Sequence, residues 1–123
     1  MTNKERSVSF LKMAGSGDVQ NAYDKFVALS FVHHNQYFKG DRQSLLNAMK
    51  DASVKSPNKS IDIEHVYEAD DTVITHSHVT RQNPAEPDIA VVHIFSFENG
   101  LIVELWDVGQ PMIKESPNEK GMF

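Results

Sequence analysis

The chain has 123 residues, 40% hydrophobic and 24% charged, a composition typical of one globular domain rather than of a disordered or two-domain protein. Its formal net charge is −5 at pH 7 and its twelve basic residues are scattered, which argues against nucleic-acid binding. The lack of cysteine excludes disulfides, thiolate nucleophiles and cysteine-ligated zinc. We see no signal-like core and no apolar run of membrane-spanning length, so we expect a cytoplasmic protein without a membrane partner.

The first half of the chain carries helical patterns. A capping box at its start predicts a helix over about residues 2–14, and Asp18 is placed to cap a second helix over 19–27. Residues 30–38 are rich in β-formers but polar in the middle, which predicts a short strand or an irregular crossing. Asp41 then caps a third helix, whose apolar stripe is Leu45, Leu46, Met49 and Ala52.

After Pro57 the hydrophobic period changes from 3.6 to 2, which indicates strands. The predicted strands cover residues 61–67, 72–80, 89–97 and 101–108. Residues 81–88 form a loop by composition, and residues from about 112 to 123 form a C-terminal tail. Helices followed by antiparallel strands predict a single α+β domain over 1–123, with the helices packed on one face of a curved sheet.

The last predicted hairpin places Asp107 among large apolar residues, and its register decides which residues are neighbours. A two-residue turn at Asn99-Gly100 would set Val92 opposite Asp107 and turn His93 to the other face. A three-residue loop with a G1 bulge would set Val91 opposite Asp107 and make His93 its diagonal neighbour on the same face. We favour the bulged register. Both faces of the hairpin are apolar, which suggests that helices cover one and another subunit covers the other.

A carboxylate in such surroundings is costly unless it is hydrogen-bonded, paired or protonated, and such groups often transfer protons. The alternative is a structural carboxylate that accepts backbone N–H bonds at a strand end. The six histidines are a second signal, because three of them on a curved sheet could bind zinc or iron. The His76-x-His78 spacing is weak evidence for a metal, and for His33 and His65 we expect ordinary hydrogen-bonded side chains.

Several motifs resemble the SnoaL-like polyketide cyclase family of the nuclear transport factor 2-like superfamily, whose fold is related to that of ketosteroid isomerase. His34-Asn35-Gln36 stands where the family has His-Asn-Pro, and residues 73–78 resemble its Val-x-His-Ser-His strand. Residues 93–97, 102–107 and 110–111 resemble its last hairpin. The similarity spans nearly the whole chain. The chain departs from the family pattern at Gln36, Ser96 and Leu105.

The resemblance implies an α+β cone (a cystatin-like roll) around an apolar pocket, and a homodimer packed through the sheet. It also implies aldol-type cyclisation or isomerisation of a small apolar carbonyl compound, with no metal or organic cofactor. Its catalytic residues would be Asp107 as the acid/base group and His93 beside it. The substrate contacts expected on this basis are His34, Asn35, Tyr37, His76, His78, Phe95 and Leu105.

Two other interpretations stay open at this point. The protein could be a non-catalytic module that binds a small apolar molecule, since the fold alone does not specify an activity. It could also be a metal-dependent enzyme that uses His76, His78 and His93 as ligands.

Overall fold

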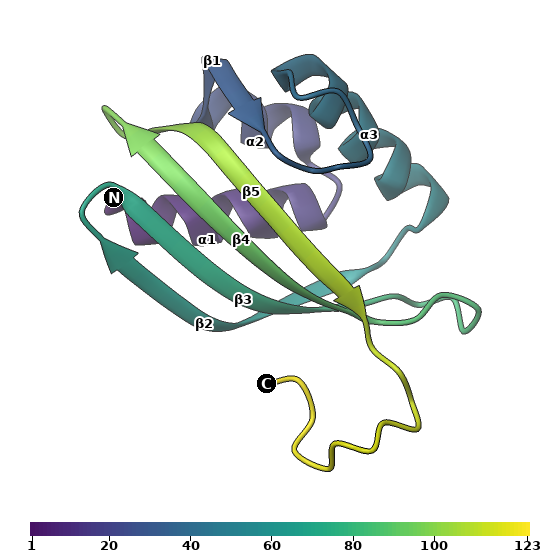
Figure 1. Cartoon of the computed structure of the whole chain (residues 1–123). Coiled ribbons are helices and arrows are strands. Elements are labelled where there is room, and N and C mark those ends of the chain that lie inside the picture. The colour runs from purple at the N-terminus through teal and green to yellow at the C-terminus, as the bar shows by residue number, and fades with distance from the viewer.

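The computed structural model describes all of residues 1–123 as three helices and a five-stranded curved sheet (Figure 1). The elements are α1 (Asn3–Gly15), α2 (Val19–Phe26), β1 (Val27–His33), α3 (Arg42–Lys55), β2 (Ser60–Ala69), β3 (Thr72–Thr80), β4 (Ile89–Glu98) and β5 (Leu101–Pro111). The strand order is β1-β5-β4-β3-β2. The predicted α+β class is confirmed, with the helices on one face of the sheet.

The helix starts follow the caps expected from the sequence. The Thr2 hydroxyl accepts from the backbone N–H of Glu5 while the Glu5 carboxylate accepts from that of Thr2, which completes the capping box. Asp41 accepts from the N–H of Ser44 at the start of α3. Asp18 precedes α2 but makes no side-chain cap bond. No helix of the chain is long and apolar enough to cross a membrane.

The strand β1 differs most from the expected pattern. It starts at Val27, earlier than the predicted stretch of 30–38, because α2 ends at Phe26 and the chain becomes extended without a linker. It pairs in parallel with β5 at one edge of an otherwise antiparallel sheet. The backbone N–H of His34 continues this pairing by donating to the carbonyl of Leu105. The segment that follows β1 is therefore held against the final strand.

The β4–β5 hairpin adopts neither predicted register. Asn99 and Gly100 both have positive φ angles, 51° and 76°, as a two-residue type I′ turn requires, so the favoured three-residue loop is wrong. The ladder then shifts by one residue at Val103, which has no partner on β4. An extra residue in one strand moves the side chains that follow it to the other face of the sheet. The bulge therefore sets His93 directly opposite Asp107. His93 and Asp107 share a face as expected, but the register shifts at Val103 within β5 and not in the turn.

The hydrophobic core lies between the helices and the face of the sheet that carries His93. Its largest fully buried side chains are Phe10, Tyr23, Leu46, Phe95 and Phe97. The opposite face of the sheet is contacted by the C-terminal tail, whose Phe123 ring lies 4.7 Å from the His76 ring and 5.2 Å from the His78 ring. The sheet therefore has a packed inner face and a sparsely covered outer face.

Candidate active site

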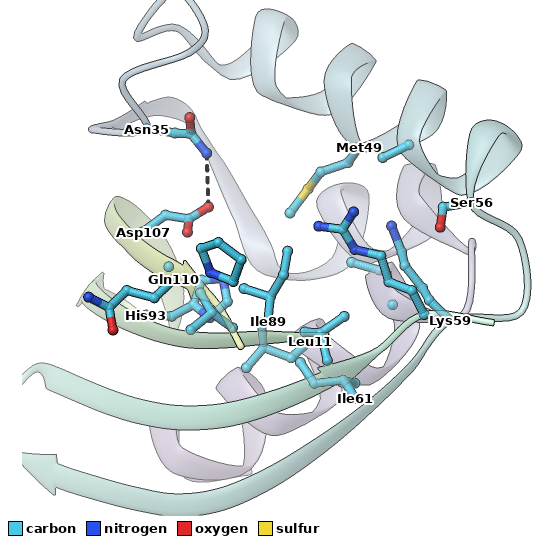
Figure 2. Close-up of a pocket in the computed structure, with 18 of the residues that line it drawn as sticks. Leu11, Asn35, Met49, Ser56, Lys59, Ile61, Ile89, His93, Asp107 and Gln110 are labelled. Carbon is cyan, nitrogen blue, oxygen red and sulfur yellow. Dashed lines mark hydrogen bonds between the residues drawn. The ribbon is translucent and has the colours of Figure 1, made fainter. Parts of the chain in front are cut away.

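A cavity of about 1030 Å³ lies on the inner face, beyond the packed core. Its walls come from α1, the segment after β1, the second half of α3, the start of β2, the end of β3 and the two last strands. Met49 and Ala52, expected in the buried stripe of α3, line this cavity. Figure 2 shows Asn35, Asp107 and His93 at one end, Lys59 and Ser56 at the other, and apolar side chains between them.

His93 and Asp107 form the centre of the first end. They are direct cross-strand partners on β4 and β5, so their Cβ atoms lie about 5 Å apart. Both side chains line the cavity. They do not hydrogen-bond to each other. Asp107 Oδ2 instead accepts a hydrogen bond of 3.1 Å from the Asn35 side-chain amide (Figure 2). The carboxylate of Asp107, which the sequence predicted to be costly among apolar residues, is thus held by a neutral donor, and its Oδ1 accepts no hydrogen bond within the chain.

The segment after β1 fixes this donor in place. Asn35 Oδ1 accepts the backbone N–H of Tyr37 at 3.0 Å, so its amide group points toward Asp107. The backbone N–H of Asn35 in turn donates to Nδ1 of the buried His33. His33 therefore carries its proton on Nε2 and donates to the Lys39 carbonyl. His33 is the hydrogen-bonded side chain that we expected, and it organises the segment that holds Asn35.

His93 has one ring nitrogen available to a ligand. Its side chain is almost fully buried, and Nδ1 is inaccessible with no hydrogen-bond partner, so Nε2 faces the cavity. Burial lowers the pKa of His93 below its ordinary value, and the nearby carboxylate of Asp107 offsets part of that shift. The imidazole is therefore neutral at pH 7 and presents either a donor or an acceptor at Nε2, depending on its tautomer.

His34 and Tyr37, two of the expected substrate contacts, line the cavity with Asn35. The His34 ring stacks on Trp106, with centroids 5.0 Å apart, and its Nε2 lies 2.6 Å from a Glu104 oxygen. Its Nε2 is thus engaged by Glu104, which lies on the outer face of the sheet. Tyr37 is 78% exposed and lies at the rim.

His76 and His78 do not belong to this cavity, contrary to expectation. They alternate with the buried Thr75 and Ser77 along β3, so they lie on the outer face while His93 lies on the inner one. His78 contacts Asp88, at 2.9 Å, and the tail instead. The three-histidine metal site is therefore not assembled, and no group of three or more histidine or acidic side chains is arranged to hold a metal ion.

Phe95 and Leu105 are also displaced from the expected site. They are cross-strand partners on the inner face, but the helices cover them completely and they belong to the core. The Phe95 ring stacks on the His93 ring, with centroids 5.8 Å apart. Their role is to support the end of the cavity that carries His93, and they do not contact its interior.

The second end of the cavity was not found from the sequence, where residues 81–88 had only a loop composition. Arg81 and Glu86 form an ion pair of 2.8 Å there, and Ser56 donates to the same Glu86 oxygen at 3.2 Å. Lys59 lines the cavity beside them. The available signal was that two cations, Lys59 and Arg81, flank the predicted strands 61–67 and 72–80.

Comparisons with known proteins agree with this architecture. A crystal structure of an uncharacterised cystatin-fold protein from Novosphingobium aromaticivorans is similar, with a TM-score of 0.74, 19% identity, and coverage of 88% of this chain and 98% of that one. IdmH from Streptomyces antibioticus, provisionally described as a polyketide cyclase, gives a TM-score of 0.75 at 14% identity over 89% and 93% of the chains. An NTF2-like protein of unknown function from Cytophaga hutchinsonii gives 0.70 at 16% identity over 90% and 92%.

These likenesses are below 25% identity and show the fold alone. A search of curated protein sequences gives no match. The SnoaL-like domain family matches residues 8–105, most of the chain, including the last hairpin to Leu105. The chain therefore belongs to the SnoaL-like domain family.

Proposed function

We propose that this protein catalyses cofactor-independent proton transfer on a small carbonyl compound bound in the cavity, leading to aldol-type cyclisation or isomerisation. The observation that carries the proposal is the direct pairing of His93 with Asp107 at the cavity wall. The pair unites a carboxylate with a neutral imidazole on one rigid hairpin. An enolisation needs those two groups, a base and a hydrogen-bond donor.

In the proposed step, the Asp107 carboxylate removes a proton from the carbon next to the substrate carbonyl. The electron pair of the broken C–H bond moves to the carbonyl oxygen, and His93 Nε2–H donates to that oxygen. In a cyclisation the enolate carbon then bonds to a second carbonyl carbon of the same molecule, and the resulting alkoxide takes up the proton. In an isomerisation the proton returns to a different carbon.

The surroundings suit these roles. Asn35 donates to Oδ2 of Asp107, which leaves Oδ1 free to meet a C–H group of the substrate. A neutral imidazole donates a hydrogen bond without the desolvation cost of an imidazolium in a buried site. The middle of the cavity is lined by Leu11, Met49, Ile61 and Ile89, which provide apolar contacts for the body of the substrate (Figure 2).

The test is deuterium exchange at the carbon next to the carbonyl, followed by proton NMR with simple ketones in D₂O. Asp107→Asn keeps an acceptor for Asn35 but removes the base, so the enzyme-catalysed rate should fall by about a hundredfold or more. Asp62→Asn makes the same chemical change at an exposed position on β2, and its rate should equal that of the wild type. Wild-type exchange in a folded Asp107→Asn variant would refute the proposed base.

A non-catalytic binding module is the second candidate. The hydrogen bond between Asn35 and Asp107 favours it, because this bond also joins the segment after β1 to β5 as a purely structural link would. A binding module would hold the same ketones unchanged, with no exchange above the background rate in the wild-type protein.

We also propose that a second copy of this chain packs on the outer face of the sheet. Val92, Ile94, Trp106 and Val108 lie on that face and are only partly covered. Analytical ultracentrifugation should give a dimer for the wild type and a monomer for Ile94→Glu. A wild-type monomer at micromolar concentration would contradict this arrangement.

A further inference from the structure

The end of the cavity away from Asp107 brings two cations together. Ser60 pairs with Thr80 where β2 meets β3, so the residues just outside this pair, Lys59 and Arg81, emerge side by side. Both line the cavity. Like charges in such cross-strand positions repel each other unless an anion lies between them. Their presence at the cavity wall therefore calls for an anion.

The protein supplies an anion for only one of these cations. Glu86 accepts from Arg81 and Ser56 through Oε2 and from Asn83 through Oε1, so its oxygens are committed. Lys59 makes no ion pair and no hydrogen bond within the chain. Lys55, at the end of α3, also lines the cavity and adds to the positive potential there.

The ammonium of Lys59 is partly withdrawn from water. Burial, and then the charge of Arg81, lower the pKa of Lys59, and Glu86 offsets part of this effect. A lysine with no role in the cavity would extend into solvent and avoid this cost. A bound anion beside Lys59 would favour its charged form.

We propose that Lys59 binds a carboxylate of the substrate, with Ser56 and Arg81 beside it, at the opposite end of the cavity from His93 and Asp107. This assignment adds a substrate class to the proposed function. It rests on that function, because it takes the carbonyl to react at the end of the cavity that carries His93 and Asp107. The substrate class that follows is a keto acid with an apolar body between its carbonyl and one carboxylate. Of the two lysines without a partner at this end, Lys55 is exposed to solvent and Lys59 is half-buried, so we assign one negative charge to Lys59. Figure 2 shows Lys59 and Ser56 across the cavity from Asn35 and Asp107.

The test uses phenyl ketones that carry a terminal carboxylate on methylene chains of increasing length, each compared with its own methyl ester by isothermal titration calorimetry. Wild-type protein should bind the best-fitting acid about tenfold more tightly than the ester. Lys59→Met should remove this preference, and Lys59→Arg should retain it. Lys50→Met, which removes an exposed lysine of α3 outside the cavity, should leave the preference unchanged.

Equal binding of acids and esters, failure of every acid to bind, or an undiminished preference in Lys59→Met would each overturn the inference. Deuterium exchange on the bound acids reports the proposed function separately. Acid preference without exchange would refute the proton-transfer role of Asp107 and leave the carboxylate site standing. Exchange that depends on Asp107, without a preference for acids over esters, would support the proton-transfer role of Asp107 and refute the carboxylate site at Lys59.

Discussion

The two ends of the cavity are built in different ways. His93 and Asp107 stand in the middle of paired strands, above the packed rings of the core, and their positions are set by the sheet. Lys59 and Arg81 stand where strands end and loops begin, and Arg81 is held by a surface-accessible ion pair with Glu86. The difference suggests that the first end has a fixed geometry suited to chemistry, while the second can adapt to the group that it binds.

The largest effect should come from the core under the fixed end. Phe95→Ala would leave a cavity beneath His93 and lower the free energy of unfolding by about 3–5 kcal/mol. Pro87→Ala, at the exposed wall of the other end, should change it by less than about 0.5 kcal/mol. Urea denaturation measures both. Similar losses for the two variants would mean that the two ends do not differ in rigidity.

A second prediction concerns Asn35, which positions Asp107 without touching the reacting atoms. Asn35→Ala should lower the exchange rate at saturating ketone by about tenfold, with little change in the concentration that gives half the maximal rate. Asn47→Ala, on the exposed side of α3, is the control. An unchanged rate in Asn35→Ala would show that the geometry of Asp107 is set by the sheet alone.

The pH dependence of stability should also separate the two ends. Because burial lowers the pKa of His93, the unfolded chain binds a proton below about pH 6.5 that the folded chain does not bind. The free energy of unfolding therefore falls as the pH decreases through that range, by up to about 1.4 kcal/mol per pH unit for this residue. His93→Gln should remove this component, as measured by urea denaturation from pH 7 to pH 5. An identical slope in the variant would contradict the neutral assignment of His93.

The smallest effect is expected for Lys59. Its folded-state pKa is lowered, so its charge destabilises the folded chain at neutral pH, and this cost disappears only as the pH rises toward about 10.5. Lys59→Met should therefore unfold at a slightly higher temperature than the wild type at pH 7, while it loses the preference for acids. A clear decrease in thermal stability would indicate that Lys59 has a structural partner.

The sequence was sufficient for most of the architecture. Capping residues and hydrophobic periods located the helices and most strands, and the favoured bulged register expected His93 and Asp107 on one face. Neither proposed register was right, because the shift comes from a bulge at Val103 inside β5, and no composition signal marks such a site. The parallel pairing of β1 was missed for a similar reason: an edge strand is selected by tertiary packing rather than by its own pattern.

The errors in the site have two causes. His76 and His78 follow a family-like motif, but the strand alternation places them on the outer face. Lys59 and Arg81 meet only because a register shift between Ile63 and His65 changes the pairing of β2 with β3. Without this shift, Ser60 rather than Lys59 would lie opposite Arg81. Contacts that depend on irregularities within strands cannot be derived from local sequence patterns.

The most direct test of the central claim is the dependence of the deuterium exchange rate on the concentration of a keto acid, measured for wild type, Asp107→Asn and Lys59→Met. We predict that Asp107→Asn loses the maximal rate while binding of the acid is retained. We predict that Lys59→Met keeps the maximal rate and needs about tenfold more acid to reach half of it. A folded Asp107→Asn variant that exchanges at the wild-type rate would contradict the account.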